Sequence, residues 1–296
     1  MKNTPLNLCT TRPHGGEYGL YVALQERADN VMNAETEPVY GHKPARYLLQ
    51  EIAAGHKEYS ELLISQETVI GRKETREILH ELALLHTHFW QPGRALRVRF
   101  LGGEAHVHRQ IETVAKTWET HANITFDFIA QGQAEVRISF TRSGSWSLVG
   151  TDALTERDQN KATMNFDLSD ETTSPDAFPA TILHEFGHCL GCVHEHQSPA
   201  AAIQWNKPLI YSRLFQAYGW DRQKVDTNFF EQAEKELITN SGYDPLSIMH
   251  YSFPPDFTVP HTHRPPNTQL SAQDIAFIGR CYPFPASSSA STLLKG

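Results

Sequence analysis

Two histidines and a glutamate in the second half of the chain have the spacing of a metal site. Residues 184–188 read His-Glu-Phe-Gly-His. On an α-helix, residues four apart lie on one face about 6 Å apart along the axis, so both imidazoles can reach one ion. The carboxylate of Glu185 would then stand beside the metal without binding it, where it can take a proton from the attacking water. The spacing therefore predicts a two-point metal clamp with a base next to it.

A third ligand must come from outside this helix, and the residues that follow provide one. Gly191 can adopt the left-handed conformation that ends a helix, so the chain can turn back and bring His194 to the ion. Three imidazoles leave one coordination position open. Zinc with three protein ligands is the catalytic type, whereas structural zinc is enclosed by four ligands, usually including thiolates. We therefore predict a catalytic Zn²⁺ held by His184, His188 and His194.

A bare H-E-x-x-H pattern has a plainer interpretation. It also occurs in helices that bind no metal, as two surface histidines beside a solvated glutamate. Here Gly191 and His194 stand at the offsets that a third ligand requires. This additional agreement favours the metal site.

These residues resemble a known family. The pattern H-E-x-x-H-x-x-G-x-x-H that begins at His184 resembles the metzincin clan of zinc endopeptidases, and Glu195 directly after it resembles the astacin branch. Residues 247–251, Ser-Ile-Met-His-Tyr, resemble the astacin Met-turn. The resemblance implies that Met249 forms an apolar floor under the imidazoles. It also implies that Tyr251 is either a fifth, displaceable ligand or a donor to the tetrahedral intermediate.

The resemblance extends over about residues 95–283 and has consequences for fold and function. Residues 144–150, Gly-Ser-Trp-Ser-Leu-Val-Gly, resemble an astacin segment that has cysteine where this chain has Ser145. The family implies a zincin-like α+β fold and a zinc-dependent endopeptidase, with Glu185 as general base and a peptide or protein as substrate. Two other classes stay open: a zinc enzyme acting on a small molecule in a biosynthetic pathway, and a binding module with an idle metal. The base and the oxyanion donor argue against the second.

The chain also departs from the family. The astacin disulfide framework is missing, and we find no match to the prosegment aspartate that covers the zinc in astacin zymogens. Cys9 lacks the flanking residues of the matrixin cysteine that blocks zinc as a thiolate. In secreted astacins the residue equivalent to Glu195 pairs with the processed N-terminus, whereas its partner here is not evident. Residues 1–92 are a region of unknown role: a cap, a partner surface or an unremoved prosegment.

Hydrophobic periodicity predicts the elements that carry these residues. Alternation predicts strands, and three- and four-residue steps predict helices. We expect a twisted, mostly parallel sheet whose last strand is the antiparallel edge of the cleft, with an active-site helix and a mainly helical C-terminal subdomain. The expected strands are 95–101, 123–129, 134–140 and 161–166, and the expected helices are 45–56, 73–89, 104–121, 178–190, 208–218, 228–238 and 271–280, the last with Ser271 as N-cap.

Length and composition indicate the class of protein and its domain organisation. The chain has 296 residues, 40% of them hydrophobic, which suits a globular protein with a core. The Gln91-Pro92-Gly93 break places a domain boundary, giving an N-terminal region 1–92, a catalytic domain 93–284 and a flexible tail 285–296. The formal net charge of −8 argues against a nucleic-acid binder. No apolar run reaches the roughly 20 residues of a membrane helix.

The same features lead to an expectation about location. The first residues lack the apolar core of a signal peptide, and four cysteines are too few for a disulfide scaffold. We expect a cytoplasmic protein, with export by a route that needs no signal peptide as the alternative. The sequence does not set the oligomeric state.

Other reactive side chains have plainer interpretations. Cys189 and Cys192 form C-x-x-C at a helix end and are expected to be small buried residues rather than a redox pair. His196 is expected beside the metal site or at the surface, not as a ligand. Other histidines are expected on a helix surface or in solvated loops: His80, His86, His88, His261 and His263.

Overall fold

The computed structural model describes residues 88–142, 144–168, 175–231 and 243–285, together with Glu26 and the backbone of two short antiparallel strands, β1 (Val39–Tyr40) and β2 (Lys43–Pro44). The helix expected at 45–56 and most of the helix expected at 73–89 lie outside these residues, as does the tail from residue 286. His88 and Phe89 are described and are not helical. The backbone of His88 has φ 47°, and its carbonyl accepts a hydrogen bond from the amide of Thr151 at 2.9 Å.

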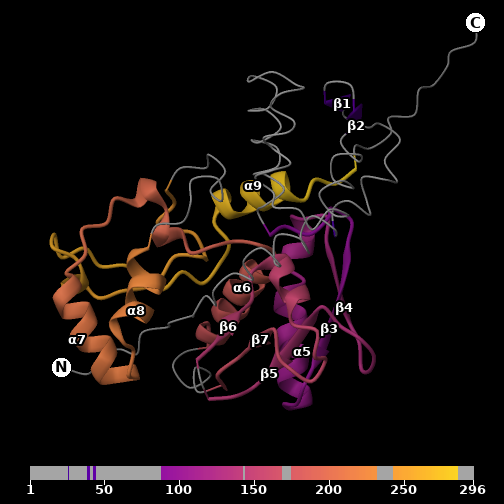
Figure 1. Cartoon of the computed structure of the whole chain (residues 1–296), viewed down its shortest axis with the longest axis horizontal. Coiled ribbons are helices and arrows are strands. Elements are labelled where there is room, and N and C mark those ends of the chain that lie inside the picture. Colours follow the sequence, from indigo (N-terminus) through magenta and orange to yellow (C-terminus); the bar gives the residue numbers. More distant parts are fainter. Residues whose placement is uncertain are drawn as a thin grey trace, which may run out of the picture.

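A five-stranded mixed sheet forms one half of the molecule (Figure 1). Its strand order is β4-β3-β5-β7-β6. The strands are β3 (Ala95–Phe100), β4 (Thr125–Phe128), β5 (Val136–Ser139), β6 (Trp146–Ser147) and β7 (Met164–Asn165). β3 alternates as its sequence predicts, with Leu96 and Val98 fully buried between more exposed neighbours.

The edge of this sheet differs from the prediction. The strand expected at 161–166 is present as β7, but it runs parallel to β5 and is not the antiparallel edge. That edge is β6, which pairs antiparallel with β7 through Trp146–Asn165 and Ser147–Met164. β6 is only two residues long, so it has no alternation by which sequence periodicity could find it.

Two helices pack together beside the sheet. α5 (Ala105–Ala115) is shorter than the helix expected at 104–121, because the amide of Thr117 bonds to the Val114 carbonyl three residues back and the chain tightens into a 3₁₀ turn, η1 (Trp118–Thr120). α6 (Ala177–Cys189) agrees with the helix expected at 178–190. The indole of Trp118 donates to the Leu183 carbonyl of α6 at 3.1 Å, which fixes α6 beside the end of α5.

The C-terminal half is mainly helical and lies to the left and above in Figure 1. α7 (Lys207–Tyr218) and α9 (Ala272–Cys281) agree with the helices expected at 208–218 and 271–280, and Ser271 is the N-cap of α9 as predicted. Ser271 also forms a capping box with Asp274, and Gly219 follows the end of α7. Only the start of the helix expected at 228–238 lies among the described residues, and there residues 228–230 form the end of a π-helical turn. α8 (Arg222–Val225) and a π-helical turn, η6 (Asp226–Phe230), come earlier, and Glu231 is already extended.

Two apolar cores meet near α6. The first lies between the sheet, α5 and α6, and includes Met249. The second lies under α7, α8 and η6, and includes Tyr251. The chain thus passes from one core to the other within the Met-turn predicted from the sequence. No helix among the described residues is long and apolar enough to cross a membrane.

Candidate active site and metal centre

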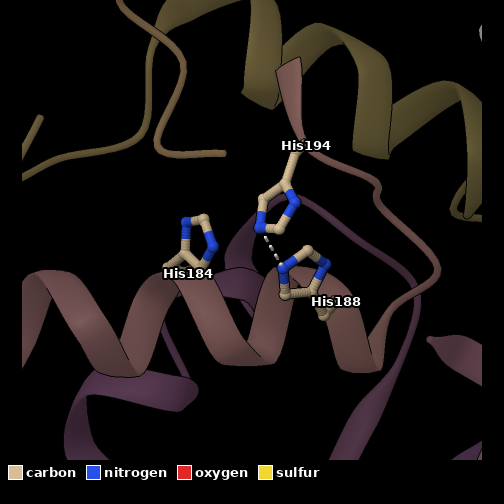
Figure 2. A group of neighbouring side chains, drawn as sticks. All are labelled: His184, His188 and His194. Atoms are coloured by element: carbon tan, nitrogen blue, oxygen red, sulfur yellow. Dashed lines mark hydrogen bonds between the residues drawn. The ribbon is translucent and has the colours of Figure 1, made fainter. Parts of the chain in front are cut away.

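The active-site helix α6 brings His184 and His188 to one face, one turn apart (Figure 2). Gly187 lies between them, and its missing side chain has a packing reason. A Cβ there would come within 2.4 Å of the Met249 sulfur. Met249 therefore packs against α6 at Gly187, one residue before His188, in agreement with the floor that the Met-turn resemblance implies.

Gly191 turns the chain back after α6, as predicted. Its φ is +95°, a conformation that favours glycine, and a Cβ there would meet the ring of Phe89 at 2.6 Å. The amide of Gly191 bonds to the His188 carbonyl at 2.8 Å, and the amide of Cys192 bonds to the Gly187 carbonyl at 3.0 Å. This tight end of the helix lets His194 come back over it, as Figure 2 shows.

The three predicted imidazoles converge. One ligand nitrogen from each of His184, His188 and His194 lies within 4.8 Å of the others, and the Nε2 atoms of His188 and His194 are 3.1 Å apart. Two nitrogens bound to one tetrahedral zinc ion would stand about 3.3 Å apart. The spacing of this pair therefore suits a shared ion.

The hydrogen bonds on the outer sides of two rings fix their tautomers. Nδ1 of His184 is 2.8 Å from the Ile248 carbonyl, and Nδ1 of His188 is 2.8 Å from the Cys192 carbonyl. A carbonyl only accepts, so each Nδ1 carries the proton and each Nε2 is free to bind a metal. The Nε2 atom of His184 is buried without a hydrogen-bond partner among the described residues. This donor set fits zinc.

Burial also keeps the rings in the form that a metal needs. Removal from water lowers the pKa of His184 to about 4, although its bond to the Ile248 carbonyl opposes the shift. Burial likewise holds the pKa of His188 and of His194 well below the ordinary value. All three imidazoles are thus neutral near pH 7, which is the ligating form.

The two predicted catalytic side chains lie beside this triad. Glu185 is next to His184 on α6 and is 1% exposed. Tyr251 is 2% exposed, and its ring centroid lies 4.3 Å from that of His194 and 6.4 Å from that of His184. The structure therefore gathers all five residues predicted from the sequence around one place.

The structure provides Glu195 with a partner that the sequence did not reveal. Its carboxylate accepts a hydrogen bond from the backbone amide of Asp244 at 2.7 Å. Glu195, Asp244 and Asp274 line a small cavity between α9 and the loop after α6. Burial, with these neighbouring carboxylates, raises the pKa of Glu195 to about 7.

Asp274 is a supporting residue that the sequence analysis missed. Its carboxylate accepts from the Ser247 hydroxyl at 2.7 Å and from the Ile248 amide at 2.8 Å. The carbonyl of Ile248 in turn holds His184. Ser271 and Asp274 form the capping box of α9, a short S-x-x-D signal that could have drawn attention to Asp274 but not to its contact with the Met-turn.

Among the described residues, the other cysteines and histidines singled out in the sequence are buried, partly buried or exposed in loops. Cys189 and Cys192 are buried and free, and burial raises the pKa of both thiols, so they are not a redox pair. His196 is 3% exposed, and its ring centroid lies 5.2 Å from that of His194. His88 is not on a helix surface: its Nδ1 is 3.0 Å from a carboxylate oxygen of Asp152. His261 and His263 are exposed, as expected for a loop.

Comparison with known proteins adds independent findings. Residues 85–262 match the model of the Astacin peptidase family. A structure of myroilysin is 36% identical, covers 68% of this chain and 98% of that chain, and has a TM-score of 0.64. A second myroilysin structure is 37% identical, with 67% and 86% covered and a TM-score of 0.54.

A structure of high choriolytic enzyme 1, a hatching enzyme zinc-protease from the medaka fish Oryzias latipes, is 18% identical, with 66% and 94% covered and a TM-score of 0.43. A search of curated proteins gave no match.

The zincin-like α+β fold and the three-histidine site define a metallopeptidase, and the family match makes the assignment specific. The chain belongs to the astacin family. It is a zinc-dependent endopeptidase, and its substrates are peptides or proteins. The alternative of a zinc enzyme acting on a small molecule is not favoured.

Proposed function

We propose that His184, His188 and His194 hold the catalytic zinc, that Glu185 is the general base, and that Tyr251 stabilises the oxyanion. The observation that carries this assignment is the convergence of three neutral imidazoles next to a buried carboxylate and a tyrosine. A zinc ion bound there supplies a Lewis acid, which acidifies water and polarises the peptide carbonyl.

Glu185 moves the proton. As a carboxylate adjacent to the first ligand on α6, it accepts a proton from the attacking water and then gives it to the leaving amine. Its position on a rigid helix, rather than on a loop, keeps this base at a fixed place relative to His184 and His188. The hydroxyl of Tyr251 donates to the oxygen that gains negative charge as the carbonyl carbon becomes tetrahedral.

The edge strand β6 is the place where an extended substrate would lie. It ends the strand order of the sheet and contacts α6, so a peptide pairing with it passes beside the triad. Main-chain hydrogen bonds at a sheet edge bind unfolded segments with little regard to side chain. This placement supports internal cleavage of extended peptide segments.

The test is the variant Glu185→Gln, which keeps the size of the side chain but removes the base. We expect turnover of a peptide library to fall about 10²- to 10⁴-fold. Zinc content by elemental analysis should stay at the wild-type level, because Glu185 is not a ligand. Glu112→Gln, which changes a glutamate on the outer side of α5, is the matched control and should cleave normally. Wild-type turnover by Glu185→Gln would refute the role of Glu185.

A further inference from the structure

His196 lies two residues after the third histidine, and its ring is pressed against Tyr251. It belongs to a 3₁₀ turn, η4 (Glu195–Gln197), and is 3% exposed. The rings of His196 and Tyr251 are stacked, with centroids 4.2 Å apart and planes 24° apart. The ring centroid of His194 lies 5.2 Å from that of His196 and 4.3 Å from that of Tyr251. His196 thus forms one wall of the space that Tyr251 occupies.

The other side of His196 is fastened to the π-helical turn η6. Its Nε2 is 3.0 Å from the carbonyl of Asn228, and a carbonyl only accepts, so Nε2 carries the proton. Directly beside it, the amide nitrogen of Gln197 donates to the carbonyl of Thr227 at 2.8 Å. Two successive side chains of η4 therefore hold two successive carbonyls in the last turn of η6, where a helix leaves carbonyls without partners of its own.

The turn held in this way supplies the opposite wall. Phe229 of η6 is 1% exposed, and its ring meets that of Tyr251 edge to face at 5.2 Å. It also lies 5.8 Å from the ring of His196. The rings of His194, His196 and Phe229 therefore surround Tyr251. The hydrogen bond from His196 to Asn228 fixes the positions of two of these rings, those of His196 and Phe229.

We propose that His196 is a positioning residue of the reaction: it stacks on Tyr251 and, through Asn228, fixes the turn that carries Phe229, so that the tyrosine hydroxyl is held where the oxyanion forms. This inference rests on the proposed function of Tyr251. A histidine suits the position because it combines a flat ring for stacking on Tyr251 with a ring N–H that donates to the Asn228 carbonyl. Phenylalanine would keep the ring and lose the bond.

The experiment is a double-mutant cycle with His196→Phe and Tyr251→Phe in the zinc enzyme. We expect His196→Phe to lower kcat about 10- to 100-fold at unchanged KM, because a displaced donor weakens only the transition state. In the Tyr251→Phe background, His196→Phe should have no further effect on kcat, since the hydroxyl that it positions is gone.

Two further readouts separate positioning from simple packing. A phosphinic peptide imitates the tetrahedral intermediate, and its affinity for His196→Phe should fall by the same factor as kcat/KM. Unfolding of the metal-free protein reports packing alone. The matched control is His108→Phe: His108 also stacks on an aromatic ring, Phe100, at 3.8 Å and also has Nε2 at 2.8 Å from a carbonyl, that of Gly102. Because His108 is only partly buried, His108→Phe should lower stability less than His196→Phe does, and it should leave kcat and inhibitor affinity unchanged.

The outcomes are distinct. Unchanged kcat in His196→Phe, or the same loss of kcat in both backgrounds, overturns the positioning role while leaving the proposed function intact. Unchanged kcat in Tyr251→Phe removes the proposed role of the tyrosine and this inference with it. If His196→Phe does not fold, His196→Gln enters the same cycle. It keeps an N–H for the Asn228 carbonyl but has no ring, and it should lower kcat only when Tyr251 is present.

Discussion

At the scale of single residues, the proposed zinc ligand His184 depends on groups that are remote in the chain. His184 is held by the Ile248 carbonyl, and the Ile248 amide is held by Asp274 on α9. Ile248 of the Met-turn thus connects the buried carboxylate of Asp274 to His184. Hydrogen bonds of this kind set the tautomer and orientation of a ligating imidazole and are worth 10- to 100-fold in metal affinity in other sites.

This connection gives a prediction for Asp274→Asn. The change removes the negative charge and replaces one acceptor oxygen by an N–H donor, so the bond from the Ile248 amide is weakened, and it is lost if the donor faces that amide. We expect zinc affinity to fall about 10- to 100-fold in competition with a chelator. Asp221→Asn is the control, because Asp221 also caps a helix, through the Lys224 amide, but lies on α8. Equal zinc affinity in wild type and Asp274→Asn would show that the connection does not act on His184.

Physical reasoning from the sequence could predict the residues whose geometry is local, whereas Met249 and Tyr251 were predicted only through the family resemblance. His184, Glu185 and His188 follow from the period of one helix, and His194 follows from a glycine turn within three residues of it. Asp274 and Asn228 were out of reach. Their contacts join residues 26 and 32 positions apart, and nothing in a linear pattern indicates which carbonyl a distant side chain will meet.

At the scale of elements, α6 packs closely against the Met-turn because Gly187 has no side chain. Gly187 is helical, and a glycine in a helix interior costs about 1 kcal/mol relative to alanine. The structure accounts for that cost, because any Cβ would overlap the Met249 sulfur. Close contact between the ligand helix and its floor is therefore set by this one residue.

The variant Gly187→Ala tests this fit. Helix propensity alone predicts about 1 kcal/mol of stabilisation. We expect instead a net loss of about 1–3 kcal/mol in the free energy of unfolding, because Met249 must move and Trp118 is also close, at 3.3 Å. Denaturant unfolding of the metal-free protein measures it. A variant more stable than wild type would mean that Met249 yields without cost.

Helices and strands with a long hydrophobic pattern were predicted near their observed bounds. Elements that form only through contact with a neighbouring element were predicted poorly. The strands β3, β4 and β5 and the helices α6, α7 and α9 were confirmed near their expected bounds. β6 was missed because two residues form a strand only beside β7. The helix expected at 228–238 overlaps the turn η6 only at residues 228–230, and the chain is already extended at Glu231.

At the scale of the whole molecule, one buried carboxylate joins distant parts of the described chain. Glu135, at the start of β5, accepts from the side chain and the amide of Arg97 on β3. Arg94 reaches both Glu135 and Glu26, so Glu26 lies beside the start of β3. Burial alone would raise the pKa of Glu135, but the bonds with Arg97 outweigh it, and the pKa is lowered.

The sign of this shift predicts a pH dependence. A carboxyl group whose pKa is lower in the folded state stabilises the fold above its unfolded value near 4.5, and that stability is lost as the pH falls through the folded value. Glu135→Gln should therefore cost about 1–2 kcal/mol at pH 7, and less as the medium becomes acidic. Unfolding of both proteins from pH 7 to pH 3 measures the difference. A cost that is constant with pH would contradict the prediction.

Two aromatic residues that are far apart in the chain, Trp90 and Tyr282, meet at the end of α6. The Trp90 indole donates to the Cys189 carbonyl at 2.7 Å, and the Tyr282 hydroxyl donates to the Leu190 carbonyl at 2.7 Å. The amide of Trp90 also bonds to the Tyr282 hydroxyl at 3.1 Å. A shortened chain that begins after Trp90 or stops before Tyr282 would lose bonds at the end of the helix that carries His184 and His188, so we expect the smallest active fragment to contain both aromatic residues.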